Sequence, residues 1–329
     1  MQSTLSRYRT LPARAHARPH LAHGSDVNTD ADSTDSTHPV ATSQALTERL
    51  AAMRPRLHRY CARMTGSVAD GEDVLQDALL RALEAGRDGR TIANLDGWIF
   101  RIAHRAALDH IRRRARRDAR ASNEDVTKLG DPSAATDVRV AVQSSLAAFM
   151  RLPISQRSSV VLVDVLGHSV EEASIITASS VAAVKSTLHR GRARLRDFAT
   201  TPDQAAVLSP QDQRLLRAYS DHLNARDFDA LRDMLAEQVR LEVVGRTTLS
   251  GRAAVTTTYF GNYRQTNDWR CVPGVVEGRP GILVYDVADQ LARPRYFILT
   301  EWHDGLLVAA RDFRHAAYAA ESAMMSPLA

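Results

Sequence analysis

The chain of 329 residues carries a net charge of +5 at pH 7, and its positive charge is concentrated in residues 101–120 and 185–196. The length suits two or three domains, and no apolar run approaches the roughly 20 residues that a membrane-spanning helix needs. Cys61 and Cys271 lie far apart in different predicted domains, so we expect no disulfide framework, metal site or cofactor. We therefore expect a cytoplasmic protein without a membrane segment, whose two basic stretches favour DNA binding.

Residues 1–44 have few large hydrophobic side chains and are rich in Ser, Thr, Asp, His and Arg, which predicts a disordered tail. The first 20 residues carry arginines and no acidic residue, a superficial likeness to a transit peptide. We favour a tail or an over-long predicted start over that interpretation.

Residues 45–120 form the first predicted helical domain. Within it, residues 70–84 (DGEDVLQDALLRALE) repeat apolar side chains at helical spacing, so one side of this helix is expected to be buried. Leu80 falls on the opposite side, where an exposed leucine ringed by acids provides a docking face for a basic partner helix. A surface helix with a stray leucine would show the same pattern. The predicted docking residues are Asp73, Gln76, Asp77, Leu80 and Arg81.

Residues 94–117 (NLDGWIFRIAHRAALDHIRRRARR) predict one amphipathic helix that ends in a dense arginine run. Ile99, Phe100 and Ala103 share a sector suited to a core, whereas several arginines fall in another sector beside Trp98. Guanidinium groups beside an indole suit a nucleic-acid backbone with a base available for stacking, and a solvated basic face is the alternative. The predicted DNA-binding residues of this helix are Trp98, Arg101, Arg105, Arg112, Arg113 and Arg116.

Residues 121–136 are polar and predict a linker, which leads to a second helical domain at residues 137–199. Between Leu152 and Arg196, two predicted helices flank a short turn at residues 178–180, which is the layout of a helix-turn-helix. Small residues at the start of the second helix would let it enter a major groove. Its predicted DNA-binding residues are Ser180, Ala182, Lys185, Ser186, His189 and Arg190.

Together, the three segments resemble the extracytoplasmic-function group of sigma-70 factors, the promoter-reading subunits of bacterial RNA polymerase. The resemblance covers about residues 50–196 and rests on DGEDVLQDALLRALE, LDGWIFRIAHRAALDHIRRRARR, DVLGHS, SVAAVKS and LHRGRARLR. It implies that the first segment docks on the polymerase clamp, the second reads the −10 element and the helix-turn-helix reads the −35 element. Family members often carry Gly where this chain has Ala178, so either this turn stays right-handed or the module is strained. Ile175 stands where the family usually has a charged residue.

Residues 200–210 are a predicted connector to a domain of different character at residues 211–320. We predict a helix from Gln211 to Leu235, alternating strand residues at 239–243 and a second helix at residues 252–263. Further strands are predicted near residues 270–276, 282–287, 295–302 and 306–313, with a hairpin turn at Asp304 and Gly305 and a short tail at residues 321–329. Helices followed by a curved antiparallel sheet predict an α+β cone.

The run YSDHLNARDFDALRDMLAEQVRLEV and the terminal strand pair resemble the SnoaL-like domain of the nuclear-transport-factor-2-like superfamily. Cones of this kind enclose an apolar pocket, in which the enzymes of the superfamily place a carboxylate or a histidine. The pocket candidates here are Tyr219, Trp302 and Asp312. An inward strand phase would bury Asp312 and raise its pKa, whereas the alternative places Asp312 against an arginine or in water. Because no nucleophile, base and orienting group assemble in the sequence, we predict no catalytic residues and a protein that is not an enzyme.

The predicted fold class is therefore multidomain, with two all-α sigma domains, the second carrying the helix-turn-helix, followed by the α+β cone. The leading hypothesis is a sigma factor whose partners are core RNA polymerase and promoter DNA, with a regulatory role for the fused C-terminal domain that the resemblance implies. One alternative is a helix-turn-helix regulator that acts without polymerase. The other is a bifunctional factor whose C-terminal domain binds or turns over a small-molecule ligand.

Overall fold

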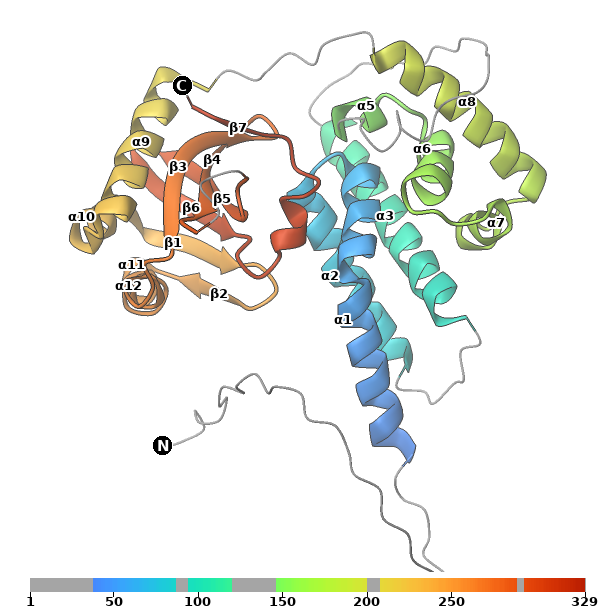
Figure 1. Ribbon diagram of the computed structural model, residues 1–329, viewed down its shortest axis with the longest axis horizontal. Helices are drawn as coiled ribbons and strands as arrows, with labels where there is room; N and C mark the ends of the chain where they lie inside the picture. The colour runs from blue at the N-terminus through green and yellow to red at the C-terminus, as the bar shows by residue number, and fades with distance from the viewer. Residues whose placement is uncertain (1–37, 87–93, 120–145, 200–207, 289–292, 329) are drawn as a thin grey trace, which may run out of the picture. The chain divides into compact units, whose positions relative to one another are not determined.

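The structure, a computed structural model, describes residues 38–86, 94–119, 146–199, 208–288 and 293–328. The predicted linker at residues 121–136 and most of the predicted tail and connector lie outside these ranges. The first three helices are α1 (His38–Thr65), α2 (Val68–Gly86) and α3 (Leu95–Ala119) (Figure 1). The start of α1 at His38 corrects the predicted end of the N-terminal tail at residue 44.

Local sequence sets the limits and the packing of these helices. The Asn94 side chain accepts a hydrogen bond of 2.9 Å from the Gly97 amide, which satisfies one of the free donors at the start of α3. The apolar stripes of the three helices meet in one core, where Leu57, Leu75 and Phe100 are buried. Burial of the predicted core side of α3 confirms the helical spacing found in the sequence.

The next four helices form the second helical region. They are α5 (Leu146–Met150), α6 (Ile154–Val160) with a π-helical turn at Val161–Val165, α7 (Val170–Thr177) and α8 (Val181–Ala199). Of these, α7 and α8 are the helix-turn-helix. Ser169 and Glu172 form a reciprocal capping box that starts α7. Ala178 ends α7 with φ +53°, so the turn is left-handed. Of the two interpretations of this alanine, a right-handed turn or a strained module, the structure therefore supports the strained module.

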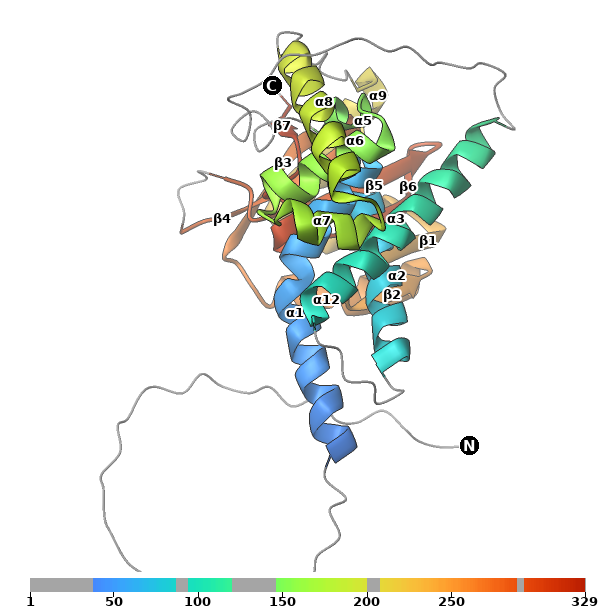
Figure 2. The same ribbon diagram turned by 90° about the vertical axis from the view of Figure 1, so that its right-hand side faces the viewer.

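The two helical regions share their hydrophobic core. Residues of α1, α3, α6 and α8 belong to one buried cluster, and α7 lies against α3 (Figure 2). Arg157 of α6 is buried and donates hydrogen bonds to the carbonyl oxygens of Met64 at 2.5 Å and Leu152 at 3.0 Å. Burial lowers the pKa of Arg157 to about 10, which leaves the guanidinium charged at neutral pH. A buried arginine therefore ties the end of α1 to the start of the second helical region.

The C-terminal domain starts with α9 (Pro210–Ala225) and α10 (Phe228–Asp233) rather than with the single helix predicted for residues 211–235. Arg226 adopts a left-handed conformation with φ +60°, which stops α9. Asp227 then starts α10, because its carboxylate accepts a hydrogen bond of 3.0 Å from the Ala230 amide. The predicted helix at residues 252–263 is present as α11 (Arg252–Ala254), a π-helical turn at Val255–Phe260 and α12 (Gly261–Arg264).

Seven strands form one curled sheet in the order β2-β1-β6-β5-β4-β3-β7, with α9 packed against β3 (Figure 1). The strand β1 pairs in parallel with β6, so the sheet is mixed and not purely antiparallel as predicted. Asp304 and Gly305 both have positive φ in the β5–β6 turn, which confirms the predicted hairpin. The strands are β1 (Leu235–Val243), β2 (Thr247–Ser250), β3 (Trp269–Val276), β4 (Arg279–Asp286), β5 (Tyr296–His303), β6 (Leu306–Asp312) and β7 (Met325–Pro327).

Two of these strands were not predicted. The strand β2 pairs antiparallel with β1, and β7 pairs antiparallel with β3 at the edge of the sheet. The strand β7 lies in residues 321–329, so these residues are not the free tail that the sequence suggested. Short strands of four and three residues carry too few positions for an alternating pattern to be recognised.

The sheet has an apolar core on each face. One core fills the cone between the sheet and helices α9–α12. The other core joins Phe297 and Phe313 of the C-terminal domain to Val68 and Ala69 at the start of α2. The C-terminal domain and the first helical region therefore share buried apolar surface, which stabilises their contact.

Candidate functional site

The exposed face of α2 keeps its predicted character. Leu80 has 59% of its surface exposed, and Asp73 and Arg81 are also exposed. Gln76 and Asp77 are half-buried, and the Asp77 carboxylate lies 3.5 Å from the guanidinium of Arg113 on α3. An apolar anchor with an acidic rim is thus present on one accessible helix face.

Asp73 is engaged by the C-terminal domain. Arg311 of β6 donates to the Asp73 carboxylate at 2.6 Å, and its guanidinium also lies 3.0 Å from the carboxylate of Glu242 on β1. Burial alone would lower the pKa of Arg311, but the two carboxylates outweigh burial and raise it. The contact between Arg311 and Asp73 was not predicted, because the two residues are remote in the chain.

Two further polar contacts join the C-terminal domain to α2. The Glu277 carboxylate, in the β3–β4 turn, accepts hydrogen bonds of 3.0 and 3.3 Å from the Val68 amide at the start of α2. The Tyr318 hydroxyl donates at 2.8 Å to Glu72, a fully buried carboxylate that also accepts from Arg54 at 2.8 Å. The C-terminal domain thus supplies partners for the first turns of the predicted docking helix.

The arginines of α3 are accessible. Arg105, Arg112, Arg113 and Arg116 are exposed, whereas Trp98 and Arg101 at the start of the helix are half-buried. Arg113 and Arg116 also line a surface groove of about 380 Å³ with His110 and Arg117, two residues that the predicted set omitted. The RRRARR run contained the signal for Arg117, because the run continues past the residues selected by helical phase.

The second helix of the helix-turn-helix presents all six predicted residues to solvent. Ser180, Ala182, Lys185, Ser186, His189 and Arg190 are exposed, and Val184 and Leu188 are buried beneath them. The Ser180 hydroxyl accepts a hydrogen bond of 3.1 Å from the Ala183 amide, so it caps α8. Ile175, the unusual residue of α7, is 53% exposed.

The predicted pocket residues of the cone lie in its core. Tyr219 packs edge-to-face on Trp302 with ring centroids 5.7 Å apart. Asp312 is 1% exposed and accepts hydrogen bonds from the Tyr259 hydroxyl at 2.8 Å, the Tyr263 hydroxyl at 3.0 Å and the Arg314 amide at 2.7 Å. Burial raises the pKa of Asp312, as expected for the inward strand phase. Tyr263 was missed in the sequence, although its spacing of four residues from Tyr259 places both on one helix face.

Within the described residues, no group of His, Cys, Asp and Glu side chains has the arrangement of a metal site. Cys61 and Cys271 are both buried and free. No helix in the described ranges is long and apolar enough to cross a membrane.

Comparison with known proteins agrees with the geometry of the helical regions. Residues 50–117 match the family model for sigma-70 region 2, and residues 146–195 match that for sigma-70, region 4. ECF RNA polymerase sigma factor SigM of Mycobacterium tuberculosis H37Rv is 37% identical over 140 residues, which cover 43% of this chain and 69% of the relative. The chain belongs to the extracytoplasmic-function (ECF) family of RNA polymerase sigma factors. The resemblance noted in the sequence is thereby confirmed.

A second relative extends the match. ECF RNA polymerase sigma factor SigG of the same organism is 29% identical over 276 residues, covering 73% of each chain. Among solved structures, the crystal structure of M. tuberculosis extracytoplasmic function sigma factor SigJ has a TM-score of 0.32 and 20% identity, covering 81% of this chain and 95% of that chain. An NTF-2 like protein of unknown function from Burkholderia xenovorans LB400 has a TM-score of 0.25 and 14% identity, covering 31% of this chain and 80% of that chain. The family assignment rests on the sequence matches.

Proposed function

We propose that this sigma factor binds core RNA polymerase through the exposed face of α2, reads promoter DNA through α3 and α8, and is regulated by its C-terminal domain. The observation that carries the proposal is the Arg311–Asp73 ion pair of 2.6 Å, because it joins the C-terminal domain to the predicted docking face.

The docking part of the proposal rests on α2. Leu80 is a large apolar side chain that folding leaves 59% exposed, and Asp73 and Asp77 flank it. A partner helix with an apolar anchor and basic neighbours complements this surface. Charge reversal at Asp77 and a polar substitution at Leu80 should each weaken polymerase binding.

The DNA part rests on two separate basic faces. The arginines of α3 are accessible to a phosphate backbone, with Trp98 at the other end of the helix for base stacking. Lys185, His189 and Arg190 project from α8, the second helix of the helix-turn-helix, which is the helix that enters the major groove in such modules. Two DNA-binding faces on one chain fit contact with two promoter elements.

The regulatory part rests on the surface that the C-terminal domain covers. Arg311 neutralises Asp73, and the domain buries Val68, Ala69 and Glu72 beside it. A polymerase that requires the Asp73 carboxylate must first displace Arg311. The fused domain would thus act where a separate inhibitory protein acts for other regulators, by occupying part of the docking face.

We further propose that the C-terminal domain is not an enzyme. Both carboxylate oxygens of Asp312 already accept hydrogen bonds, from the Tyr259 and Tyr263 hydroxyls and the Arg314 amide. Burial raises the pKa of Asp312, but its carboxylate has hydrogen-bond partners within the protein on both oxygens. The buried carboxylate therefore needs no substrate to satisfy it. A turnover activity that Asp312→Asn abolishes, while transcription stays intact, would contradict this view.

The test is run-off transcription with purified core RNA polymerase, using DNA upstream of the gene as template. Point variants of the full chain are preferable to truncation, because removal of the C-terminal domain would expose Val68 and Ala69. We expect Arg311→Gln to increase polymerase affinity and Leu80→Asp to decrease it, with promoter-specific transcripts that depend on the protein. Arg232→Gln, a change to an exposed arginine of α10, is the matched control. Equal affinity of the Arg311→Gln and parent chains would refute the regulatory part and leave the docking part standing.

A further inference from the structure

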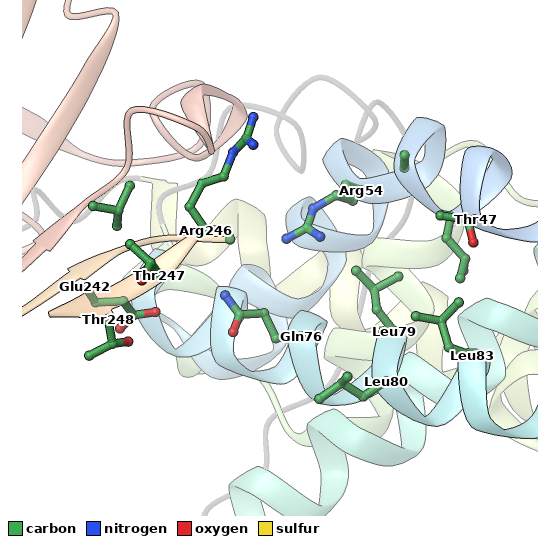
Figure 3. Close-up of a pocket in the computed structure, with 14 residues that line it drawn as sticks. Thr47, Arg54, Gln76, Leu79, Leu80, Leu83, Glu242, Arg246, Thr247 and Thr248 are labelled. Carbon is green, nitrogen blue, oxygen red and sulfur yellow. The ribbon is translucent and has the colours of Figure 1, made fainter. Parts of the chain in front are cut away.

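A groove of about 480 Å³ lies between α1, α2 and the turn that joins β1 to β2 (Figure 3). This volume is in the range of small-molecule sites. Leu79, Leu80 and Leu83 line it from α2, and Leu50 and Ala51 line it from α1. Leu80 is 59% exposed, so folding leaves this part of the apolar floor uncovered, whereas Leu50 and Leu79 are buried.

Two arginines stand at one end of the groove. Arg246, in the β1–β2 turn, is exposed and forms no ion pair with any residue that the structure describes. Arg54 reaches from α1 toward the turn in Figure 3, and its Nη2 lies 3.6 Å from where a Cβ on Gly245 would stand. Arg54 already pairs with Glu72 at 2.8 Å, so Arg246 is the guanidinium of this pair that lacks a counter-charge among the described residues.

The acidic side of the groove has a cationic partner, which it shares with Asp73. Glu242 is the sole acidic residue among the described residues that line it, and Arg311 holds the Glu242 carboxylate at 3.0 Å. The groove therefore combines an arginine without an ion-pair partner among the described residues, Arg246, with an apolar floor. An anion at this end of the groove would supply the counter-charge that Arg246 lacks among the described residues.

We propose that this groove binds an amphipathic monoanion, with a carboxylate head between Arg54 and Arg246 and an aliphatic chain on the leucines of α1 and α2. The head gains charge-assisted hydrogen bonds, and each methylene that covers Leu80 or Leu83 is removed from water. A nucleic acid or an acidic peptide would satisfy the arginines but would leave the leucine floor exposed. A bound ligand would touch both α2 and the C-terminal domain, and its effect on polymerase docking rests on the function proposed above.

Calorimetric titration of the full chain with decanoate tests the site. Decylammonium has the same chain with the opposite charge, and acetate has the same head without the chain. We expect saturable binding of decanoate, at least about tenfold weaker binding of decylammonium, and no heat from acetate. Equal binding of decanoate and decylammonium would show an apolar surface only and would overturn the anionic assignment.

Four variants locate the ligand. Arg246→Gln should weaken decanoate binding about tenfold, which is the worth of a charge-assisted hydrogen bond, whereas Arg240→Gln on β1 should leave it unchanged. Ala51→Trp should block the groove, whereas Ala52→Trp should not, because both alanines are exposed on α1 but only Ala51 lines the groove. Decanoate binding that Arg246→Gln and Ala51→Trp leave intact would overturn the proposal. A second combination of results would also overturn the proposal: the parent chain does not bind decanoate, and Ala51→Trp loses polymerase binding. The groove would then be a binding site for a protein.

Discussion

Glu277 shows at the scale of a single residue how the C-terminal domain meets the first helical region. Its carboxylate caps α2 from another domain, in a turn where Glu277 itself has φ +51°. Burial is the main reason that its pKa rises from 4.5 to about 7, while the Val68 amide and Arg279 oppose the rise. A group with such a pKa changes charge in the physiological range.

We expect Glu277 to make stability depend on pH. Its folded pKa lies above the unfolded value, so its stabilising contribution is complete below about pH 4.5 and is lost as the pH rises through about 7. The loss is at most about 3.5 kcal/mol, because each tenfold change in proton affinity between the folded and unfolded chain is worth about 1.4 kcal/mol. Urea unfolding of the Glu277→Gln variant should therefore show a flatter decline between pH 5 and pH 8 than the parent chain. Glu301→Gln, at an exposed position, should retain the parent slope, and a parent-like slope for Glu277→Gln would contradict the assignment.

A second residue-scale prediction concerns Ala178 in the helix-turn-helix. Its φ of +53° places an alanine in a conformation that costs an L-residue roughly 1 kcal/mol. Ala178→Gly should raise the free energy of unfolding by up to about 1 kcal/mol, measured by urea denaturation, because the strain disappears. Ala183→Gly is the matched control, since this exposed alanine inside α8 should lose about 1 kcal/mol on the same change. Destabilisation by Ala178→Gly would show that the turn is not strained.

At the scale of elements, sequence reasoning succeeded where neighbours in the chain decide the outcome. Helical spacing predicted the buried side of α2 and the outward residues of α8, alternation predicted β1, and strands were also predicted at the places of β3 to β6. It failed at the break at Arg226, because a single left-handed residue leaves no periodic signal. It also failed for the parallel pairing of β1 with β6 and for the Arg311–Asp73 contact. Both depend on residues that are distant in sequence, and one chain carries no pattern that links them.

The arginine face of α3 yields a prediction that belongs to the helix as a whole. Arg112 is exposed and lies 3.8 Å from Asp109, so it can turn to a phosphate at little cost. Arg112→Ala should weaken the polymerase–promoter complex on all sequences alike and reduce the slope of log affinity against log salt by about 1. Filter binding at several salt concentrations measures this slope. Arg214→Ala on α9 should leave the slope unchanged, and an unchanged slope in Arg112→Ala would remove this residue from the DNA surface.

At the scale of the whole molecule, the described domains are connected through α1 and α2. Arg157 ties the second helical region to the end of α1, and the apolar core around Phe313 ties the sheet to the start of α2. The helix that we propose as the polymerase-docking element is thus also the element on which the C-terminal domain depends. The regulation that we propose would act by displacement, because polymerase and the C-terminal domain would compete for one side of α2.

A substitution at Tyr318 tests whether the C-terminal domain depends on α2. Its hydroxyl donates to Glu72 at 2.8 Å, and Glu72 is fully buried, so Tyr318→Phe removes one partner of a buried carboxylate. We expect a loss of about 2 kcal/mol in the free energy of unfolding, because the unsatisfied oxygen keeps its desolvation cost. Hydrogen exchange should accelerate at the amides of Val68 and Ala69, where the C-terminal domain covers α2. Tyr285→Phe, at a buried tyrosine in the same apolar core, should change stability by less than about 0.5 kcal/mol. If Tyr318→Phe lost stability without faster exchange at Val68, the hydrogen bond to Glu72 would not hold the C-terminal domain on the start of α2, and the competition for α2 would lose its support.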